Sequence, residues 1–365
     1  MNILHVGNIR NLQYNGVCVV VPKILESQSK IANVTLLNLS NYVPENSKNN
    51  YRVLPIEGIK DSLDEVMVNA NLIVFHEFYW HQYIKLYKKA VILGIPYIIL
   101  PHGSTTQYAQ KVKKIKKYAG NILYFNKFAK NASAIHYLSN KEKKESIYPF
   151  AESFVVGNGI EIHKERKKRF SINEVKLIYI GRIDPYIKGL DILIESLKLI
   201  KKTDMACKVK VTIAGTGTYK NVKYIKDLID QYQLNEIVKL EDAIYGQAKI
   251  NKLMANDCFI QLSRTEAQPL GLMEAMSLGM PAIATPGTTF YEIVKNENVG
   301  IPVLGDPMEV SNTIVDIING KYILENICKN SSRYIIENYN WKTISHTTLE
   351  KYKYVLTNRI HKETR

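Results

Sequence analysis

The sequence predicts an α/β protein built from two doubly wound domains, and three observations support this fold class. Short apolar runs rich in β-branched residues alternate with longer amphipathic stretches along the chain. This alternation occurs in two successive series. The chain has 365 residues, of which 46% are apolar and 23% charged, a globular composition with enough length for two domains. Short buried strands separated by helices form parallel sheets, which bind ligands at the carboxyl ends of their strands.

The expected elements follow from this alternation. In the first series the predicted strands are residues 2–6, 34–39, 72–75 and 97–100, and the predicted helices are residues 17–32 and 82–93. In the second series the predicted strands are residues 175–180, 209–214, 258–262 and 282–285, and the predicted helices are residues 190–201, 219–232 and 272–278. Apolar and aromatic residues between positions 341 and 356 share one helical face, which can pack on another element.

A polar run at residues 161–170 separates the two series. It is rich in Lys and Arg and has no apolar periodicity, which indicates a solvated interdomain linker more than an anion site. We therefore expect a Rossmann-like domain at residues 1–165, a second one at residues 170–338, and a final helical segment at residues 339–365.

Several protein classes are disfavoured by composition. The longest apolar run, residues 90–101, is shorter than the roughly 20 residues of a membrane-spanning helix. The first residues lack the basic and apolar regions of a secretory signal. The four cysteines form no Cys-x-x-Cys pair, which argues against a disulfide framework or a zinc ribbon. We expect a reduced, cytoplasmic protein.

The net charge of +15 is uneven. Residues 1–169 hold 24 basic and 12 acidic side chains, whereas residues 170–365 hold 25 and 22. This field suggests an anionic partner such as phospholipid headgroups or nucleic acid, although lysine as a general solubiliser would also explain it. The lysine-rich segment at residues 110–117 continues into apolar positions. It predicts one amphipathic helix, which is either an ordinary surface helix or one that rests on an anionic bilayer.

Metal-binding patterns are weak. His76 and His81 are five residues apart, about 140° around a helix, so they cannot share a zinc ion as the zinc-protease motif requires. No Asp-x-Asp pair is present to hold a metal-bound nucleotide. Gly215 and Gly217 begin like a dinucleotide-binding turn but lack its third glycine, so a tight strand-to-helix turn explains them equally well.

Two basic groups follow the first strand of the second series. Arg182 and Lys188 lie on one loop, next to Gly181 and a second glycine. A guanidinium and an ammonium in such a loop suit a pyrophosphate. The structural alternative is that Arg182 pairs with Asp184.

A second group surrounds a predicted helix start. Pro269 suits the first turn of a helix, because its missing N–H would have no partner there. The next three amides can then meet a phosphate; they belong to Leu270, Gly271 and Leu272. Glu266 precedes this helix and Glu274 lies within it, so both can accept hydrogen bonds from hydroxyls of one nucleotide sugar. For Glu274 alone, an interaction with the helix dipole is the alternative.

Two features of the first series are also candidates. His102, followed by a glycine, ends the predicted strand at residues 97–100, and we expect it to point into an interdomain cleft. Tyr14, Asn15 and Gly16 precede the first helix, where a flexible turn can approach a phosphate. By itself, the Asn-Gly pair indicates only a turn.

Together these motifs resemble the retaining glycosyltransferases of family 4, which have the GT-B fold. The specific matches are Gly181-Arg182 with Lys188-Gly189, the Glu-x7-Glu motif of Glu266 and Glu274, and its continuation to Pro281. Supporting matches are Pro101-His102-Gly103, Gly157-Asn158-Gly159-Ile160 and Trp341. The chain departs from the family at Ala267 and Thr288, where glycines are usual, and in an N-terminal loop that keeps only Gly16.

The resemblance implies two Rossmann-like domains that face each other across a cleft, with a nucleotide-diphosphate sugar bound mainly to the second. It implies that Arg182 and Lys188 hold the diphosphate, Glu274 the ribose, Glu266 the hexose, and His102 the transferred sugar. The other expected donor contacts are Gly16, Gly181, Pro269, Leu270, Gly271 and Leu272.

The resemblance also implies retention of anomeric configuration, and neither a metal nor a cofactor. It further implies a final helix that crosses back to the first domain. The expected activity is hexosyl transfer to a saccharide or lipid-linked acceptor during synthesis of a cell-surface polysaccharide or glycolipid. We expect the protein to be peripheral on the inner face of the cell membrane. The alternatives are a nucleotide-sugar 2-epimerase of the same fold and a non-catalytic, basic nucleic-acid-binding protein, for which no recognised motif is present.

Overall fold

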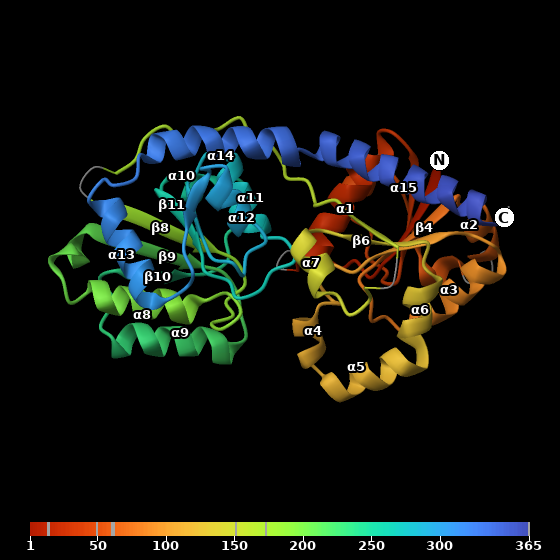
Figure 1. Ribbon diagram of the computed structural model, residues 1–365, viewed down its shortest axis with the longest axis horizontal. Coiled ribbons are helices and arrows are strands. Elements are labelled where there is room, and N and C mark those ends of the chain that lie inside the picture. The colour runs from red at the N-terminus through yellow and green to blue at the C-terminus, as the bar shows by residue number, and fades with distance from the viewer. Residues whose placement is uncertain (13–14, 49, 60–62, 150–151, 172–173, 364–365) are drawn as a thin grey trace. The chain divides into compact units, whose positions relative to one another are not determined.

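The computed structural model describes residues 1–12, 15–48, 50–59, 63–149, 152–171 and 174–363, which form two compact units (Figure 1). Unit 1 comprises Met1–Gly159 and Trp341–Arg365, and unit 2 comprises Ile160–Asn340. Each unit contains one parallel sheet with helices on both faces. The predicted α/β class with two doubly wound sheets is therefore confirmed.

The sheet of unit 1 has the strand order β3-β2-β1-β4-β5-β6-β7, and all paired strands are parallel. Its strands are β1 (Asn2–Gly7), β2 (Asn33–Asn38), β3 (Arg52–Pro55), β4 (Leu72–His76), β5 (Tyr97–Leu100), β6 (Ala134–Tyr137) and β7 (Ser153–Val155). Its helices are α1 (Gly16–Ser29), α2 (Leu63–Val68), α3 (Gln82–Ile92), α4 (Gln107–Lys111), α5 (Lys114–Gly120), α6 (Asn126–Asn131), α7 (Asn140–Glu145) and α15 (Trp341–Glu363). Strands β2 and β3 lie on one side of β1, and strands β4 to β7 lie on the other. The topological switch point is therefore between β1 and β4.

Different helices cover the two faces of this sheet. On one face, Phe75 of β4 packs against Tyr83 of α3 and Phe128 of α6, with ring centroids 4.8 and 5.2 Å away. On the other face lie α1 and α15, which pack against each other (Figure 1). The Ser345 hydroxyl of α15 donates to the hydroxyl of Ser27 on α1 over 2.7 Å. The final helix is therefore part of the core of unit 1.

The sheet of unit 2 has the strand order β10-β9-β8-β11-β12-β13, again with parallel pairs. Its strands are β8 (Val175–Ile180), β9 (Val209–Ala214), β10 (Val238–Glu241), β11 (Cys258–Gln261), β12 (Ala282–Ala284) and β13 (Gly300–Pro302). Its helices are α8 (Leu190–Ile200), α9 (Tyr219–Gln231), α10 (Gly246–Met254), α11 (Leu270–Ser277), α12 (Tyr291–Asn296), α13 (Pro307–Ile318) and α14 (Leu324–Tyr339). The switch point lies between β8 and β11.

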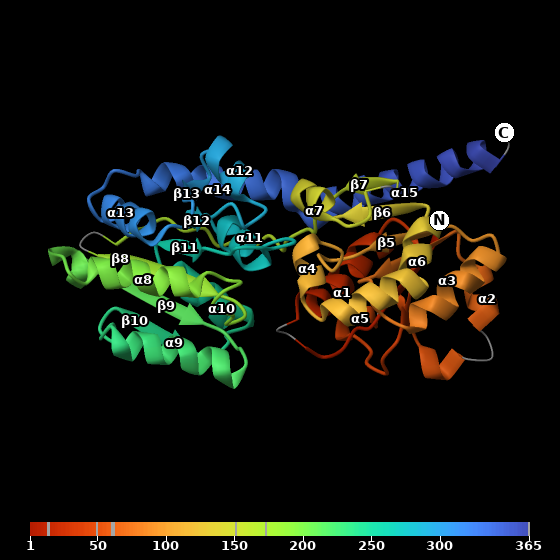
Figure 2. The same cartoon turned by 60° about the horizontal axis from the view of Figure 1, so that its bottom comes forward.

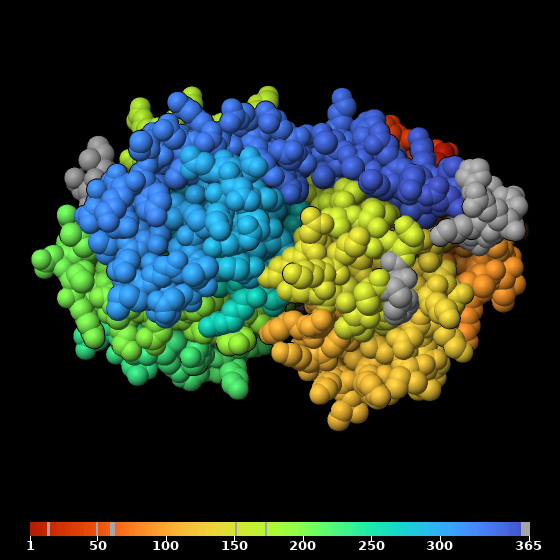
Figure 3. Space-filling view, in the orientation of Figure 1, coloured from red at the N-terminus to blue at the C-terminus, as the bar shows by residue number. Residues whose placement is uncertain are grey.

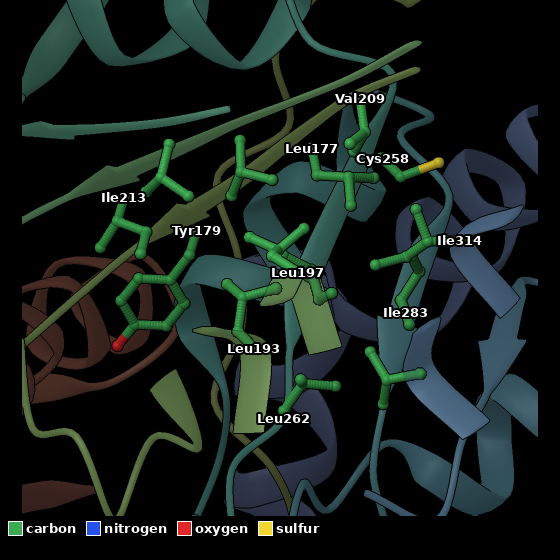
Figure 4. Packing of buried hydrophobic residues seen from close by; sticks show 14 of the residues in the cluster. Leu177, Tyr179, Leu193, Leu197, Val209, Ile213, Cys258, Leu262, Ile283 and Ile314 are labelled. Carbon is green, nitrogen blue, oxygen red and sulfur yellow. The ribbon is translucent and has the colours of Figure 1, made fainter. Parts of the chain in front are cut away.

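The core of unit 2 has two layers, one on each face of its sheet (Figure 2). One layer is formed with α8, α9 and α13, and includes Leu177 and Tyr179 of β8 packed near Leu193 and Leu197 of α8 (Figure 4). The other layer is formed with α10, α11, α12 and α14. The central strands carry apolar side chains on both faces of the sheet, so they are apolar throughout. Such continuous apolar runs can be recognised in the sequence.

All the strands predicted from apolar runs are present, with ends that differ by at most one residue. Sequence patterns missed the short strands β3, β6, β7, β10 and β13. Four of these five are edge strands, and β6 lies next to one. An edge strand buries less apolar surface, so its sequence carries less of the pattern that identifies a strand.

The predicted linker at residues 161–170 begins unit 2, and its side chains are exposed or partly exposed except that of Lys167. Residues from Ile160 onward belong to unit 2, and Lys167 is 5% exposed. Its Nζ lies 3.5 Å from Oδ1 of Asp257 and donates to the carbonyl of Met254 over 3.3 Å. Asp257 also accepts from the backbone N–H of Ser171 and Lys176. The charge that suggested solvent exposure at Lys167 is instead neutralised inside the unit.

The single amphipathic helix predicted around residues 110–117 is also wrong. The chain leaves helical geometry at Val112 and then forms α5, a π-helical turn (Asn121–Phe125) and α6. Lys113 has the left-handed backbone angles φ 55° and ψ 41°. The break is held by Lys117, whose Nζ donates to the carbonyl of Ala109 over 2.6 Å and lies over the ring of Tyr79.

Candidate active site

Lys188 and Glu266 meet at the carboxyl edge of the sheet of unit 2. The Lys188 ammonium pairs with Oε1 of Glu266. The same oxygen accepts a hydrogen bond from Nε2 of Gln261 over 2.8 Å and one from Oγ of Ser263 over 3.2 Å. Both side chains are about 85% buried, with exposed fractions of 15% and 13%. The Glu266 carboxylate is therefore held in one orientation by three donors.

The backbone explains why these two loops meet. Gly189, the N-cap of α8, has φ +66°, and a Cβ there would lie 2.0 Å from the carbonyl oxygen of Leu262. The N–H of Arg264 donates to the carbonyl of Ile187 over 2.9 Å. Glycine at position 189 therefore lets the loop after β8 lie against the loop after β11.

Arg182 is the most exposed of the predicted phosphate ligands. Its side chain is 55% exposed and its Nη2 lies 3.7 Å from Oδ2 of Asp184, so the structural alternative for this residue is present as a loose ion pair. The buried Tyr179 hydroxyl donates to the Arg182 carbonyl over 2.8 Å. A Cβ at Gly181 would lie 2.7 Å from that hydroxyl. Tyr179, which sequence patterns did not single out, thus positions the backbone of this loop.

Glu274 forms a second lysine–carboxylate pair. Its Oε2 contacts the ammonium of Lys249 on α10, and the two side chains are 21% and 20% exposed. Lys249 was missed because only the packing of α10 and α11 in the same layer brings it to Glu274. The Glu-x7-Glu pattern is therefore a pair of carboxylates, each held by its own lysine.

The start of α11 differs by one residue from the prediction. Pro269 immediately precedes the helix instead of lying in its first turn. The N–H of Leu270 donates to the carbonyl of Gln268 over 3.1 Å and so is not free. Within the described chain, no acceptor is found for the N–H groups of Gly271 and Leu272. A Cβ at Gly271 would lie 3.0 Å from the Ile180 carbonyl oxygen, so glycine lets this helix start approach β8.

Two further loop contacts were missed by sequence patterns. Arg264 forms a bidentate pair with Asp191 of α8 over 2.8 and 2.9 Å, and its guanidinium lies over the ring of Tyr186. A Cβ at Gly287, in the loop after β12, would lie 1.7 Å from the Ser263 carbonyl oxygen. Thr288, which departs from the family pattern, donates to the carbonyl of Thr285. These contacts pack three loops around Glu266.

The Gly215 and Gly217 turn has a structural explanation. A Cβ at Gly215 would lie 1.8 Å from the Gly181 carbonyl oxygen, and one at Gly217 would lie 2.4 Å from that of Ile183. These glycines therefore allow the loops after β8 and β9 to touch, as the tight-turn interpretation requires.

His102 follows β5 of unit 1 with a left-handed φ of 50°. Its Nε2 lies 3.1 Å from Nδ1 of His76, at the end of β4. Burial lowers the pKa of His102 to about 3, so its ring is neutral. The buried carboxylate of Glu142 accepts from the N–H of Gly103 and of Leu138. The backbone around His102 is thus held in its strained conformation by a hydrogen bond from the next residue.

The remaining predictions for unit 1 concern the start of α1 and the two histidines. Asn15 is the N-cap of α1 and accepts from the N–H of Val17 and Cys18, so Gly16 begins the helix. Tyr14 lies outside the described residues. His76 ends β4, whereas His81 precedes α3, so they lie on different elements. Within the part of the chain that the structure describes, no group of three or more His, Cys, Asp or Glu side chains is arranged to hold a metal ion.

Solved structures share this architecture. The structure of Anabaena Alr3699/HepE in complex with UDP-glucose matches 97% of this chain and 99% of its own, with a TM-score of 0.73 and 18% identical residues. The structure of the lipopolysaccharide outer core galactosyltransferase WaaB in its apo form matches 98% of this chain and 100% of its own, with a TM-score of 0.68 and 13% identity. The fold is GT-B.

The sequence comparisons are more specific for unit 2. Residues 161–337 match the family described as Glycosyl transferases group 1, so unit 2 contains a group 1 glycosyltransferase domain. An uncharacterized glycosyltransferase of Methanocaldococcus jannaschii, MJ1607, is 26% identical over 182 residues, which are 50% of this chain and 45% of that protein. The Escherichia coli UDP-Gal:α-D-GlcNAc-diphosphoundecaprenol α-1,3-galactosyltransferase is 26% identical over 270 residues, which are 69% of this chain and 67% of that protein.

Two of the similar proteins are longer than the part that this chain matches. The chain spans less than half the length of MJ1607 and 28% of a putative colanic acid biosynthesis glycosyltransferase, WcaL of Escherichia coli. Among the described residues, no helix combines the length and the apolar character needed to cross a bilayer.

Proposed function

We propose that this protein is a retaining hexosyltransferase of family 4 that moves a sugar from a nucleotide-diphosphate sugar to a saccharide acceptor. The observation that carries the proposal is the group of Lys188, Glu266 and Arg182 at the switch point of unit 2. Two cations suit a diphosphate, and an oriented carboxylate suits sugar hydroxyls. The relatives that are named as transferases support the same chemistry. They give no support to a nucleotide-sugar 2-epimerase or to a nucleic-acid-binding protein.

In this proposal the site works by charge stabilisation. Arg182 and Lys188 bind the diphosphate, together with the free N–H groups of Gly271 and Leu272 at the start of α11. As the bond between the sugar C1 and the phosphate oxygen breaks, these groups stabilise the charge that develops on the leaving group. The acceptor oxygen forms its bond to C1 on the same face, and its proton passes to the departing phosphate.

The carboxylates and His102 position the donor. Glu274 binds the ribose hydroxyls and Glu266 the hexose hydroxyls, while their lysine partners keep both acids in place. His102 contacts the transferred sugar. Each carboxylate pairs through one oxygen, so the other oxygen can accept from the substrate. No metal has a step in this mechanism.

A panel of nucleotide sugars tests the proposal. We expect one donor of the UDP-, GDP- or dTDP-sugar series to raise the melting temperature of the purified protein, because a ligand at 100 times its Kd adds about 2.7 kcal/mol of stability. Structures of Anabaena Alr3699/HepE with UDP and with UDP-glucose make UDP-sugars the first donors to try. Sugar transfer with that donor is expected to be equal in EDTA and in Mg²⁺. The proposal would be contradicted if no donor stabilised the protein. It would also be contradicted if chelation abolished sugar transfer and Mg²⁺ restored it.

We further propose a lipid-linked acceptor and a peripheral position on the inner face of the cell membrane. The segment around α5 exposes apolar side chains beside lysines, and its outer surface is visible in Figure 3 in yellow and orange. Ile115 is 86% exposed and Tyr118 69%. Other exposed apolar residues here are Val112, Ile122 and Leu123. Such a surface suits the boundary between headgroups and acyl chains. One relative is named for a diphosphoundecaprenol-linked acceptor, which supports the lipid link.

Vesicle binding tests the membrane proposal. We expect the protein to sediment with anionic vesicles at low salt, to be released at high salt, and not to bind neutral vesicles. Each lysine near an anionic surface contributes about 1 kcal/mol, and salt screens this attraction beyond about 10 Å. Replacing four exposed lysines of this segment by Gln should weaken binding at least about tenfold; they are Lys111, Lys113, Lys114 and Lys116. Lys117 is left intact because it holds the break before α5.

A matched control carries the same change of charge in unit 2. Its four exposed lysines, also changed to Gln, are Lys202, Lys208, Lys220 and Lys226. This control should bind vesicles like the wild type, and both variants should keep nucleotide-sugar binding. Equal partitioning of the wild type and the first variant would refute membrane docking through this segment, and the proposed transfer reaction would be unaffected.

A further inference from the structure

Six side chains of unit 1 form a path of polar contacts beneath the carboxyl edge of its sheet. From the inside outward, Nε2 of His136 lies 2.8 Å from the carbonyl of Val156, and Nδ1 of His136 lies 3.4 Å from the Tyr352 hydroxyl. The side chain of Gln28 acts on that hydroxyl as a neighbouring polar group that favours its deprotonated form. Oε1 of Gln28 lies 3.0 Å from Nε2 of His5.

The path then crosses adjacent strands and reaches His102. Nδ1 of His5 on β1 lies 2.8 Å from Nε2 of His76 on β4, and Nδ1 of His76 lies 3.1 Å from Nε2 of His102 after β5. The ring planes of His5 and His76 differ by 21°, and those of His76 and His102 by 26°, so the three rings lie roughly edge to edge. His5, His76 and His136 are at most 4% exposed.

The direction of every hydrogen bond in this path follows from its inner end. A backbone carbonyl can only accept, so His136 carries its proton on Nε2 and its Nδ1 accepts from the Tyr352 hydroxyl. A neighbour that favours the deprotonated form of Tyr352 presents a donor to its oxygen, so Gln28 turns its amide N–H toward that oxygen, which leaves Oε1 of Gln28 as an acceptor. His5 therefore donates from Nε2 and accepts at Nδ1.

The two histidines on β1 and β4 fix the hydrogen-bond direction at His102. Nδ1 of His5 accepts from Nε2–H of His76, and Nδ1 of His76 accepts from Nε2–H of His102. We infer that Tyr352, Gln28, His5 and His76 act as positioning residues that hold His102 in the Nε2–H tautomer, with Nδ1 as its outward acceptor. Within the described chain, Nδ1 of His102 has no hydrogen-bond partner.

The path requires neutral rings, and the surroundings keep them neutral. Desolvation lowers the pKa of His5 and of His136 to about 4, and lowers that of His76 well below its ordinary value. The described neighbours that bear on these rings are the other histidines and polar neutral groups. A protonated ring in the middle of the path would face a donor with a donor, because an imidazolium has no acceptor.

The functional consequence of this tautomer rests on the proposed function. If His102 contacts the transferred sugar, a fixed tautomer offers an acceptor to a sugar hydroxyl and never a competing N–H. Because the path ends inside the core, the acceptor is prepared before any ligand binds, which avoids reorganisation during the reaction.

The test is a measurement of tautomers in the full-length protein without ligand. Long-range ¹H–¹⁵N correlation spectra of ¹⁵N-histidine-labelled protein distinguish a protonated from an unprotonated ring nitrogen, and a His102→Asn variant identifies the His102 signals. We expect His5, His76 and His102 all to carry the proton on Nε2. In Tyr352→Phe, the ratio of tautomers at His102 should fall about fivefold, the bias that one hydrogen bond of about 1 kcal/mol provides.

A matched control separates this effect from lost packing. Tyr97→Phe removes an equally buried hydroxyl of unit 1, one that donates to the Phe128 carbonyl on the opposite face of the sheet, and should leave the tautomers unchanged. With the donor identified above, kcat/KM should fall about fivefold in Tyr352→Phe and stay unchanged in Tyr97→Phe.

The outcomes are distinct. An Nδ1–H tautomer at His5, His76 or His102, or equal tautomer ratios in Tyr352→Phe and the wild type, overturns the inference even if sugar transfer is found. The expected tautomers and their loss in Tyr352→Phe support it even if no donor binds, in which case only the proposed function fails.

Discussion

Replacing Lys188 with alanine is expected to lower sugar transfer by about 100-fold or more, a loss on the order of 3 kcal/mol of transition-state stabilisation. Two effects combine in this variant. It removes a cation from the proposed diphosphate site, and it removes the partner that holds the Glu266 carboxylate. The measurement is kcat/KM of the purified variant with the donor that stabilises the wild type.

An exposed lysine of the same unit provides the control. Lys223 pairs with Asp227 on the surface of α9, and Lys223→Ala should have a transfer rate near that of the wild type, because exposed ion pairs contribute little. Normal turnover by a folded Lys188→Ala variant would remove Lys188 from the phosphate role.

Arg182 needs a sharper comparison because it has a partner of its own. Arg182→Ala is also expected to lose about 100-fold, whereas Asp184→Asn should lose much less. If Arg182 served mainly to pair with Asp184, the two variants would be impaired equally, and the phosphate role of Arg182 would be wrong.

Acidification from pH 6.5 to pH 4 is expected to destabilise unit 1 strongly. The unfolded chain binds protons at its histidines below about pH 6.5, whereas the folded chain does not bind them at His5 and His136 until about pH 4. The unfolded state therefore binds more protons in this window, and the free energy of unfolding falls as the pH falls. A pKa lowered from 6.5 to about 4 corresponds to about 3 kcal/mol for one such histidine.

Glu142 acts in the opposite sense. Burial raises its pKa to about 7, so the folded chain keeps this proton between about pH 4.5 and 7, and Glu142 adds about 3 kcal/mol on acidification. His5 and His136 together outweigh it, and His76 shifts in the same direction as they do. The net expectation is a loss of stability at low pH.

Denaturant unfolding at several values between pH 7 and pH 4 measures this effect. His5→Gln should flatten the pH dependence by about 3 kcal/mol, since a neutral side chain binds no proton in either state. His346, which is exposed on α15, supplies the control, and His346→Gln should leave the pH dependence as it is in the wild type. A free energy of unfolding that stays constant from pH 6.5 to pH 4 would contradict the buried, neutral state of these histidines.

Much of the site could be predicted because its residues occur as local patterns. Lys188 follows β8 closely, and Glu266 and Glu274 flank the start of α11, so their spacing indicates loops at strand ends. Their partners could not be predicted in this way. Lys249 reaches Glu274 from another helix, and Tyr179 reaches the Arg182 carbonyl from a strand interior, where its sequence context indicates only a core residue.

The errors have a common physical cause. Lysine-rich segments predict solvated surfaces, yet Lys167 is buried against Asp257 and Lys117 stabilises a break in a helix. A charged side chain can be buried when a carboxylate or carbonyl compensates it, and that partner can lie anywhere in the sequence. His5 and His136 likewise carry no local signal, since a single histidine in an apolar strand has no periodicity to interpret.

By itself, the sequence determined the two parallel sheets and the loops where the proposed chemistry lies, because burial on both faces and glycines at close approaches leave local patterns. Only the tertiary structure decided which groups meet: Lys188 with Glu266, Lys249 with Glu274, and the path from Val156 to His102. Hydrogen bonds and ion pairs depend on distances of about 3 Å between atoms. Residues that are far apart in the chain reach such distances only when the sheets and helices have packed.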